Sequence, residues 1–249
     1  TTDSRVPLRE MVKIVLTNRY VLIPYMFVFA INLSAGMRSA LTIYLFRYYF
    51  HSTELMAVAG AAGFLPILLG VGLSRWVTNT LGVRGNLVLA TLVGAITNAL
   101  VLLMPPSPTG AWIYIGITAV AGLFQGISIP AQGTMLPAAM DYVEWSTGRQ
   151  LQGFLGSLYG FFQTLANALA SAMAAASLSI IGYVPNTAQS RSTLMGLLLA
   201  IGVVPAIFTL LQMSVIWFDL SESRQSEIEM ELRQRRQGSA LEPKPTIQL

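Results

Sequence analysis

Long apolar stretches alternate with short polar segments along the chain, and this pattern predicts membrane-spanning helices. A helix that crosses the hydrocarbon core of a bilayer needs about 20 mainly apolar residues. Six stretches reach this length with at most one charged residue each, so we expect an all-α membrane protein with six transmembrane helices. The stretches are Tyr20–Phe46, Leu55–Ser74, Gly85–Met104, Trp112–Met140, Leu151–Ile181 and Leu194–Phe218.

Proline and glycine mark two of the connections between these stretches. Pro105–Gly110 reads PPSPTG, and Gly182–Ser190 reads GYVPNTAQS. Proline removes a backbone donor, and irregular backbone is excluded from lipid, so we place both segments at the membrane surface. The chain then divides into a cytoplasmic connector helix over 1–19, a six-helix domain over 20–218, and a tail over 219–249 with a cytoplasmic helix and a disordered end.

Composition favours a membrane protein over a soluble one. The 249 residues are 54% hydrophobic and 10% charged, whereas a soluble domain carries about 25% charged residues. The net charge of +4 fits the Lys and Arg that collect on the cytoplasmic side of membrane proteins, so we expect no nucleic-acid partner. Most basic residues lie in the two tails and in the connections on their side, which predicts that both termini are cytoplasmic.

Groups that carry enzymatic chemistry are nearly absent. His51 is the one histidine, the chain has no cysteine, and it holds no zinc-protease motif, catalytic triad or glycine-rich phosphate loop. We therefore expect neither an enzyme nor a bound cofactor or metal.

Arg38 is the one charged residue deep inside an apolar stretch. A charge at the bilayer centre costs at least about 2.5 kcal/mol on insertion scales, so it normally faces the bundle interior or water. One interpretation is a cation on a transport pathway that attracts an anionic group. The other is a structural guanidinium that snorkels or pairs with backbone carbonyls. Its depth favours the first.

Uncharged polar residues recur in the fourth and fifth stretches. Gln163 and Asn167 are four residues apart and share one helix face. Such side chains either line a polar cavity that binds hydroxyl groups or make interhelical hydrogen bonds of about 0.6 kcal/mol each. The sequence leaves both roles open.

The three charges between Gly85 and Ser190 are Asp141, Glu144 and Arg149. They lie together at the end of the fourth stretch. They are either ion pairs of a solvated loop, worth about 0–1 kcal/mol each, or part of a gate.

Several segments resemble the glycoside–pentoside–hexuronide:cation symporters, which are melibiose-permease-like members of the major facilitator superfamily. The segments are MLPAAMDYVEW, DYVEWSTG, SLYGFFQTLANAL and GYVPNTAQS. The likeness is to the second half of these twelve-helix proteins, in keeping with a start that lacks Met. It implies one six-helix half of a major-facilitator bundle, with the N-terminal half as partner in the same or a separate chain.

The resemblance implies secondary transport of a sugar or anionic sugar derivative by alternating access, coupled to Na+ or H+, in a bacterial inner membrane. It makes Asp141, Glu144 and Arg149 a cytoplasmic gate. It places eight residues along the substrate pathway: Asn32, Arg38, Gln125, Ile129, Gln132, Gln163, Thr164 and Asn167.

The sequence departs from the family pattern at several of these positions. Gln150 and Gln152 stand where the family has Arg and Glu, so fewer charged residues are left to form ion pairs at the gate. Thr164 stands where a Lys is usual, which weakens the case for family-type coupling, and Ile129 replaces the sugar-stacking Trp of melibiose permeases. Two other functions stay open: a stand-alone six-helix membrane assembly module, and a lysolipid carrier.

Overall fold

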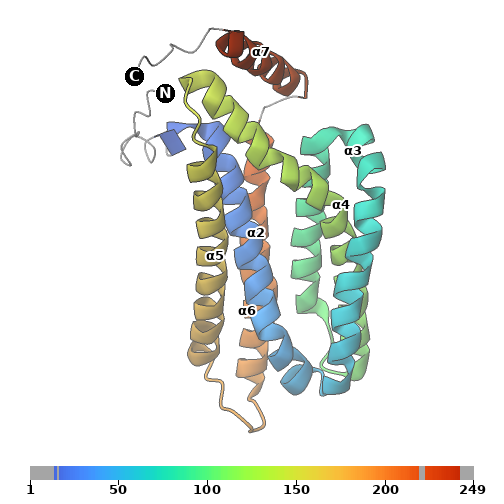
Figure 1. Cartoon of the computed structure of the whole chain (residues 1–249). Coiled ribbons are helices and arrows are strands. Elements are labelled where there is room, and N and C mark those ends of the chain that lie inside the picture. The colour runs from blue at the N-terminus through green and yellow to red at the C-terminus, as the bar shows by residue number, and fades with distance from the viewer. Residues whose placement is uncertain (1–13, 16, 219–221, 242–249) are drawn as a thin grey trace.

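The structure, a computed structural model, describes residues 14–15, 17–218 and 222–241, so most of the predicted connector helix lies outside the described residues. The described part is built from helices (Figure 1). The long ones are α2 (Arg19–Tyr44), α3 (Met56–Leu100), α4 (Pro108–Thr147), α5 (Gln152–Ile180), α6 (Arg191–Leu211) and α7 (Glu222–Leu241). The short ones are a π-helical turn, Leu45–Tyr49, and 3-10 turns at Thr53–Leu55, Val101–Leu103 and Gln212–Trp217.

The helix α3 is a hairpin of two membrane-long arms. Gly82 has φ 71° and ψ 169°, a conformation open to glycine, and the chain folds back there (Figure 1). Within the described residues, five helical segments are long and apolar enough to span a membrane, and the one containing α3 holds two arms. The fold is therefore an all-α membrane protein, consistent with six transmembrane helices.

The first arm of α3 runs past Ser74, where the apolar stretch ends. Val77 is buried, and the hydroxyl of Thr78 accepts a hydrogen bond of 2.8 Å from the Asn86 side chain on the returning arm. These contacts hold the extra helical turns together as far as Gly82.

Glycines bring the first arm of α3 and α4 into backbone contact. A Cβ atom on Gly122 would lie 2.6 Å from the carbonyl oxygen of Gly63, and one on Gly126 would lie 2.1 Å from that of Ile67. The spacing of four between Gly122 and Gly126 is the pattern that permits close helix approach in membranes.

The helix α2 passes through the middle of the bundle and packs against α5 and α6. A Cβ on Gly36 would lie 2.8 Å from the Cβ of Ala170, so α2 and α5 also approach closely. Met37 and Leu41 are fully buried in the core that α2 shares with α5 and α6.

The helix α4 has 40 residues and is about 60 Å long, twice the thickness of the hydrocarbon core. Pro130 and Pro137 lie inside it, and its last part leans over the end of the bundle (Figure 1). There α7 docks on it, because Ile228 and Leu232 are buried against a cluster that includes Tyr142.

Candidate functional site

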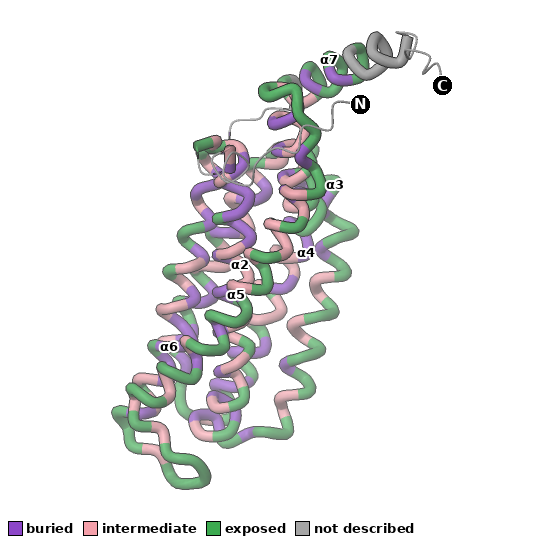
Figure 2. Tube along the Cα trace, turned by 60° about the vertical axis from the view of Figure 1, so that its left-hand side comes forward, coloured by how far each residue is buried: buried purple, intermediate pink, exposed green. Residues whose placement is uncertain are grey.

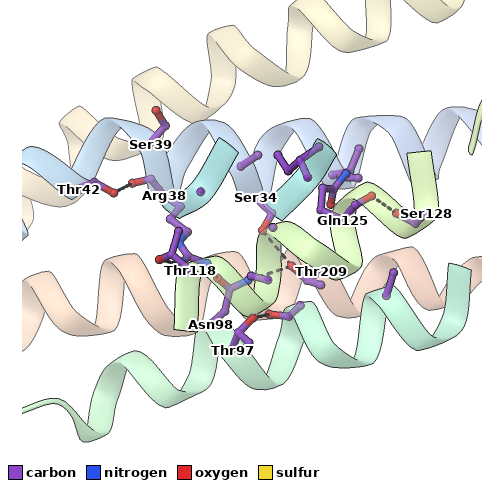
Figure 3. A pocket seen from close by; sticks show the side chains of 18 of the residues that line it. Ser34, Arg38, Ser39, Thr42, Thr97, Asn98, Thr118, Gln125, Ser128 and Thr209 are labelled. Atoms are coloured by element: carbon purple, nitrogen blue, oxygen red, sulfur yellow. Dashed lines mark hydrogen bonds between the residues drawn. The ribbon is translucent and has the colours of Figure 1, made fainter. Parts of the chain in front are cut away.

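A cleft of about 720 Å³ lies between α2, both arms of α3 and α4, with α6 contributing to its lining (Figure 3). Apolar residues make up much of its wall, and polar groups are set into it at intervals. The polar lining residues are Ser34, Arg38, Ser39, Thr42, Thr91, Thr97, Asn98, Tyr114, Thr118, Gln125, Ser128, Gln132, Thr209 and Gln212.

Arg38 points from α2 across the cleft to α3 and α4 (Figure 3). Its Nη2 donates to the hydroxyl of Thr118 at 2.8 Å, its Nη1 to the Oδ1 of Asn98 at 3.1 Å, and its Nε to the hydroxyl of Tyr114 at 3.2 Å. The guanidinium carbon also lies 5.2 Å from the centre of the Tyr114 ring. Arg38 therefore faces the bundle interior and does not snorkel to a membrane surface.

A closed circuit of hydrogen bonds fixes the Nε side of Arg38. The Thr42 hydroxyl donates to the backbone carbonyl of Arg38 at 2.7 Å, so its oxygen is left to accept from the Tyr114 hydroxyl at 3.1 Å. Tyr114 in turn accepts from Arg38. Because each hydroxyl has one proton, these three bonds have one consistent direction.

Asn98 fixes the other side and links it to α6. Its Nδ2 donates to the Thr209 hydroxyl at 3.2 Å while its Oδ1 accepts from Arg38. Thr209 also contacts the Ser34 hydroxyl at 2.9 Å, and all three of these neutral residues are buried. The guanidinium is thus held by groups from α3 and α4, and through Asn98 by α6.

The predicted pathway residues fall into two groups. Gln125 and Gln132 line the cleft with Arg38, and Gln132 donates to the Ser128 hydroxyl at 2.7 Å. The other five do not line this cleft: Asn32, Ile129, Gln163, Thr164 and Asn167.

Asn167 on α5 contacts Asn32 on α2, and Gln163 and Thr164 lie within about one turn of Asn167 on α5. Asn167 contacts Asn32 at 3.5 Å and donates to the carbonyl of Gln163 at 3.0 Å, while Thr164 bonds to its own helix. The helix α5 is the least hydrophobic of the candidate spans, and much of it is exposed or half-buried (Figure 2). Ile129 is separate, on an exposed part of α4.

The charged cluster lies at the end of α4, where Gly148 closes the helix with φ 67°. Glu144 is 6% exposed, and its two carboxylate oxygens accept from the side chains of Gln150 at 3.2 Å and Gln152 at 3.3 Å. Gln150 and Gln152 thus each donate a hydrogen bond to one oxygen of this carboxylate. Asp141 lines a small crevice of about 230 Å³ between α4 and α7.

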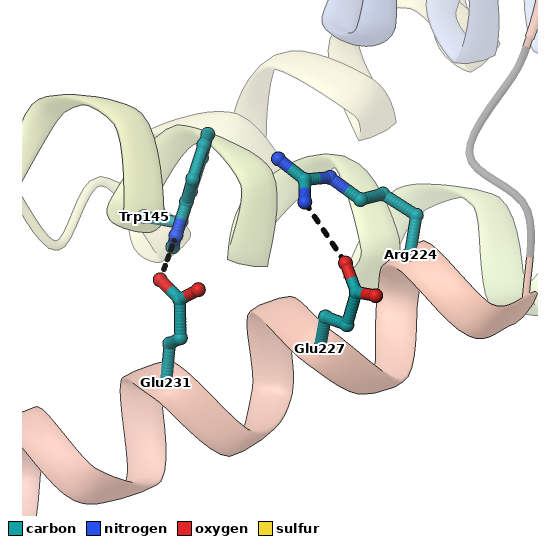
Figure 4. A network of polar contacts seen from close by, with 4 residues as sticks. All are labelled: Trp145, Arg224, Glu227 and Glu231. Carbon is teal, nitrogen blue, oxygen red and sulfur yellow. Dashed lines mark hydrogen bonds and ion pairs between the residues drawn. The ribbon is translucent and has the colours of Figure 1, made fainter.

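The tail helix α7 attaches beside this cluster (Figure 4). The indole nitrogen of Trp145 donates to the Glu231 carboxylate at 2.6 Å, and the guanidinium of Arg224 lies 5.1 Å from the Trp145 ring centre. Arg224 also pairs with Glu227 at 2.9 Å.

At the opposite end, the π-helical turn fastens the α5–α6 connection to α2. Arg47 donates to the Asn186 side chain at 2.8 Å, and the Tyr48 hydroxyl accepts from the Asn186 N–H at 3.2 Å. Tyr48 and Tyr183 also share a hydrogen bond of 3.0 Å. Desolvation first, and that hydrogen bond second, raise the pKa of Tyr183 to about 12.

Sequence reasoning missed the residues that hold Arg38, namely Asn98, Tyr114 and Thr118. Asn98 was detectable as an amide within an otherwise apolar stretch. Its pairing with Arg38, 60 residues away, depends on how the helices pack. Among the described residues, no cluster of three His, Asp or Glu side chains could hold a metal ion.

Comparison with known proteins gives consistent matches. The model of the MFS/sugar transport protein family matches residues 1–221. The uncharacterized symporter YjmB of Bacillus subtilis (strain 168) is 27% identical over 93% of this chain and 50% of its own length. The glucuronide carrier protein homolog of Escherichia coli (strain K12) is 25% identical over 80% of this chain and 43% of its own length.

An isoprimeverose transporter of Lactiplantibacillus pentosus is 30% identical over 69% of this chain and 36% of its own length. The chain spans about half the length, or less, of the curated relatives it matches.

Proposed function

Since the chain belongs to the MFS/sugar transport protein family, we propose that it supplies the C-terminal six-helix half of a secondary transporter for a sugar or an anionic sugar derivative. The relatives above are named as symporters, carriers or transporters, and none as an enzyme. In this proposal the N-terminal half, from the same or a separate chain, completes the bundle.

The observation that carries the proposal is the polar cleft inside an apolar bundle. A guanidinium, several hydroxyls and side-chain amides line a volume of about 720 Å³ between membrane-long helices. Polar groups at this depth are costly unless they face water, a ligand or one another. A cleft of this size and character suits a small polyol such as a sugar.

The exposed polar face of α5 supports a partner half. Gln163, Thr164 and Asn167 are exposed on a helix that is otherwise apolar enough to span the membrane. Facing lipid they would leave polar groups in hydrocarbon, whereas facing the other half they would line the route between the halves. With Asn32 beside them, they extend the pathway beyond the cleft, and Ile129 is a further candidate on α4.

The charged cluster suits a gate at the cytoplasmic mouth. Asp141, Glu144 and Arg149 share the end of α4, and rocking of one half against the other would make and break contacts there. We place this end, with both termini, in the cytoplasm of a bacterial inner membrane, because the basic residues collect there. The coupling ion is Na+ or H+.

Uptake into liposomes tests the proposal. The complete transporter, this chain with its N-terminal half, is reconstituted and given a glucuronide or the glucoside with the same aglycone, under an inward Na+ or H+ gradient. We expect uptake of at least one sugar above that of protein-free liposomes, faster with one of the gradients and reduced by Arg38→Ala. If neither sugar is taken up under either gradient, the proposal is contradicted.

A further inference from the structure

Arg38 has no carboxylate to balance its charge among the residues that the structure describes. Its three hydrogen-bond acceptors are one amide and two hydroxyls, all neutral. From Ile14 to Phe218 the sequence has only three carboxylates, Glu54, Asp141 and Glu144, and the other carboxylates of the described residues are on α7, which packs on the end of α4 beyond Ala131.

Those carboxylates lie at the two ends of the bundle. Glu54 is in the 3-10 turn between α2 and α3, and the other two are in the last turns of α4. Asp141 lies roughly 35 Å along α4 from Thr118, which holds the guanidinium. Because electrostatic attraction falls with distance, none of the three can act as the direct counter-charge of Arg38.

Two N–H groups of the Arg38 guanidinium make no hydrogen bond to the described residues. The guanidinium has five N–H groups, and the three hydrogen bonds use one on Nε, one on Nη1 and one on Nη2. One N–H therefore remains on each terminal nitrogen. Such donors form their strongest hydrogen bonds with the oxygens of an anion.

Other polar groups of the cleft also lack a partner. Thr91 lines the cleft, and its buried hydroxyl has no hydrogen bond among the described residues. Within the same part of the chain, the side-chain amide of Gln125 has none either, and it lies two helical turns from Thr118 on the cleft side of α4. Polar groups without a protein partner, one buried and one half-buried, are expected to bind a ligand or water.

We propose that the substrate is a sugar acid whose carboxylate or sulfonate binds the two spare N–H donors of Arg38, with its hydroxyls toward the side-chain amide of Gln125. The assignment rests on the proposed function, because it takes the cleft to carry a sugar. The three neutral acceptors orient the guanidinium without neutralising it, so the anion of the substrate supplies the missing charge.

Asn98→Asp tests this assignment, because it replaces the side-chain NH2 group by an oxygen and adds a negative charge. The new carboxylate takes the place of an amide whose oxygen is 3.1 Å from Arg38, and so gives the guanidinium a built-in counter-charge. It should compete with an anionic substrate and leave a neutral sugar less affected. Binding to the purified complete transporter is measured for a glucuronide and for the glucoside with the same aglycone.

Thr209→Val is the matched control. Asn98→Asp also removes the hydrogen bond from the Asn98 Nδ2 to Thr209, and Thr209→Val removes the same bond, together with the contact to Ser34, without adding charge. We expect Asn98→Asp to weaken glucuronide binding at least about tenfold more than glucoside binding, and Thr209→Val to change both sugars to the same extent.

Two outcomes would overturn the assignment and leave the transport proposal standing. If Asn98→Asp weakens both sugars equally, Arg38 does not bind the anionic group of the substrate. If Asn98→Asp weakens neither sugar, Arg38 needs no anion. Absence of uptake of both sugars by the wild-type transporter in liposomes would instead contradict the proposed function itself.

Discussion

Replacing Gly126 by alanine tests the close packing of α3 and α4 that shapes one wall of the cleft. A Cβ at this position would lie 2.1 Å from the carbonyl oxygen of Ile67, more than an ångström short of the 3.4 Å at which ordinary contact begins. The obstacle is backbone, which cannot rotate away as a side chain can. The two helices must therefore separate, which would also loosen the contact at Gly122.

The expected cost follows from two opposing effects. Overpacking of this kind costs about 1–3 kcal/mol. Replacing glycine by alanine inside a helix stabilises by about 0.5–1 kcal/mol when nothing obstructs the new methyl group. We expect Gly126→Ala to lower the free energy of unfolding by about 1–2 kcal/mol after both effects.

Gly116→Ala is the matched control on the same helix. A Cβ at Gly116 has no atom within 4 Å, so this variant should be neutral or slightly stabilising. Both variants are unfolded in the same mild detergent, and the midpoints are compared with that of the parent protein. Equal stability of the two variants would refute the backbone contact between α3 and α4.

Three further changes test other parts of the structure. Gly82→Ala should lower the free energy of unfolding by about 1–3 kcal/mol in the same assay, because φ is 71° at this turn of α3. Gly72→Ala, inside the helix, should not lower it, and equal effects of the two variants would argue against the turn. Glu231→Ala should weaken the attachment of α7 to Trp145 by about 1 kcal/mol or less. Amide hydrogen exchange in α7 should therefore be faster in this variant than in the control Glu229→Ala, and equal exchange rates would contradict the contact. The pKa of Tyr183 is raised above its usual 10.0, so its hydrogen bond with Tyr48 should hold below pH 10 and weaken as the pH rises toward 12. Tyr48→Phe should lower the pKa of Tyr183 in a phenolate absorbance titration. An unchanged midpoint would exclude the hydrogen bond between the two tyrosines.

Much of the fold could be predicted from the sequence because each transmembrane helix is encoded locally. The apolar stretches gave the helices and their order, and the family resemblance read from DYVEWSTG and GYVPNTAQS is confirmed. The second apolar stretch ends at Ser74, whereas the helix α3 continues to a turn at Gly82, so hydropathy did not give the length of this arm.

The candidate site could be predicted only in part. The cost of a charge in lipid identified Arg38, but its partners lie on other helices, 60 to 80 residues away. Hydropathy does not reveal which face of each helix meets Arg38. For the same reason the sequence grouped Asn167 with Arg38, whereas the structure puts Asn167 against Asn32 on another side of α2. The assignment of all these residues to a substrate route stays a prediction.

Cysteine labelling tests most directly the central claim that the substrate passes through the cleft beside Arg38. The chain has no cysteine, so a single one can be placed at Ala121, which lines the cleft, or at the next residue, Val120, which is 46% exposed and does not line it. In a complete transporter without other accessible cysteines, Ala121→Cys should react with a membrane-impermeant thiol reagent and be protected by saturating sugar, while Val120→Cys should stay unreactive. Labelling of Ala121→Cys that sugar does not slow, or faster labelling of Val120→Cys, would contradict the account.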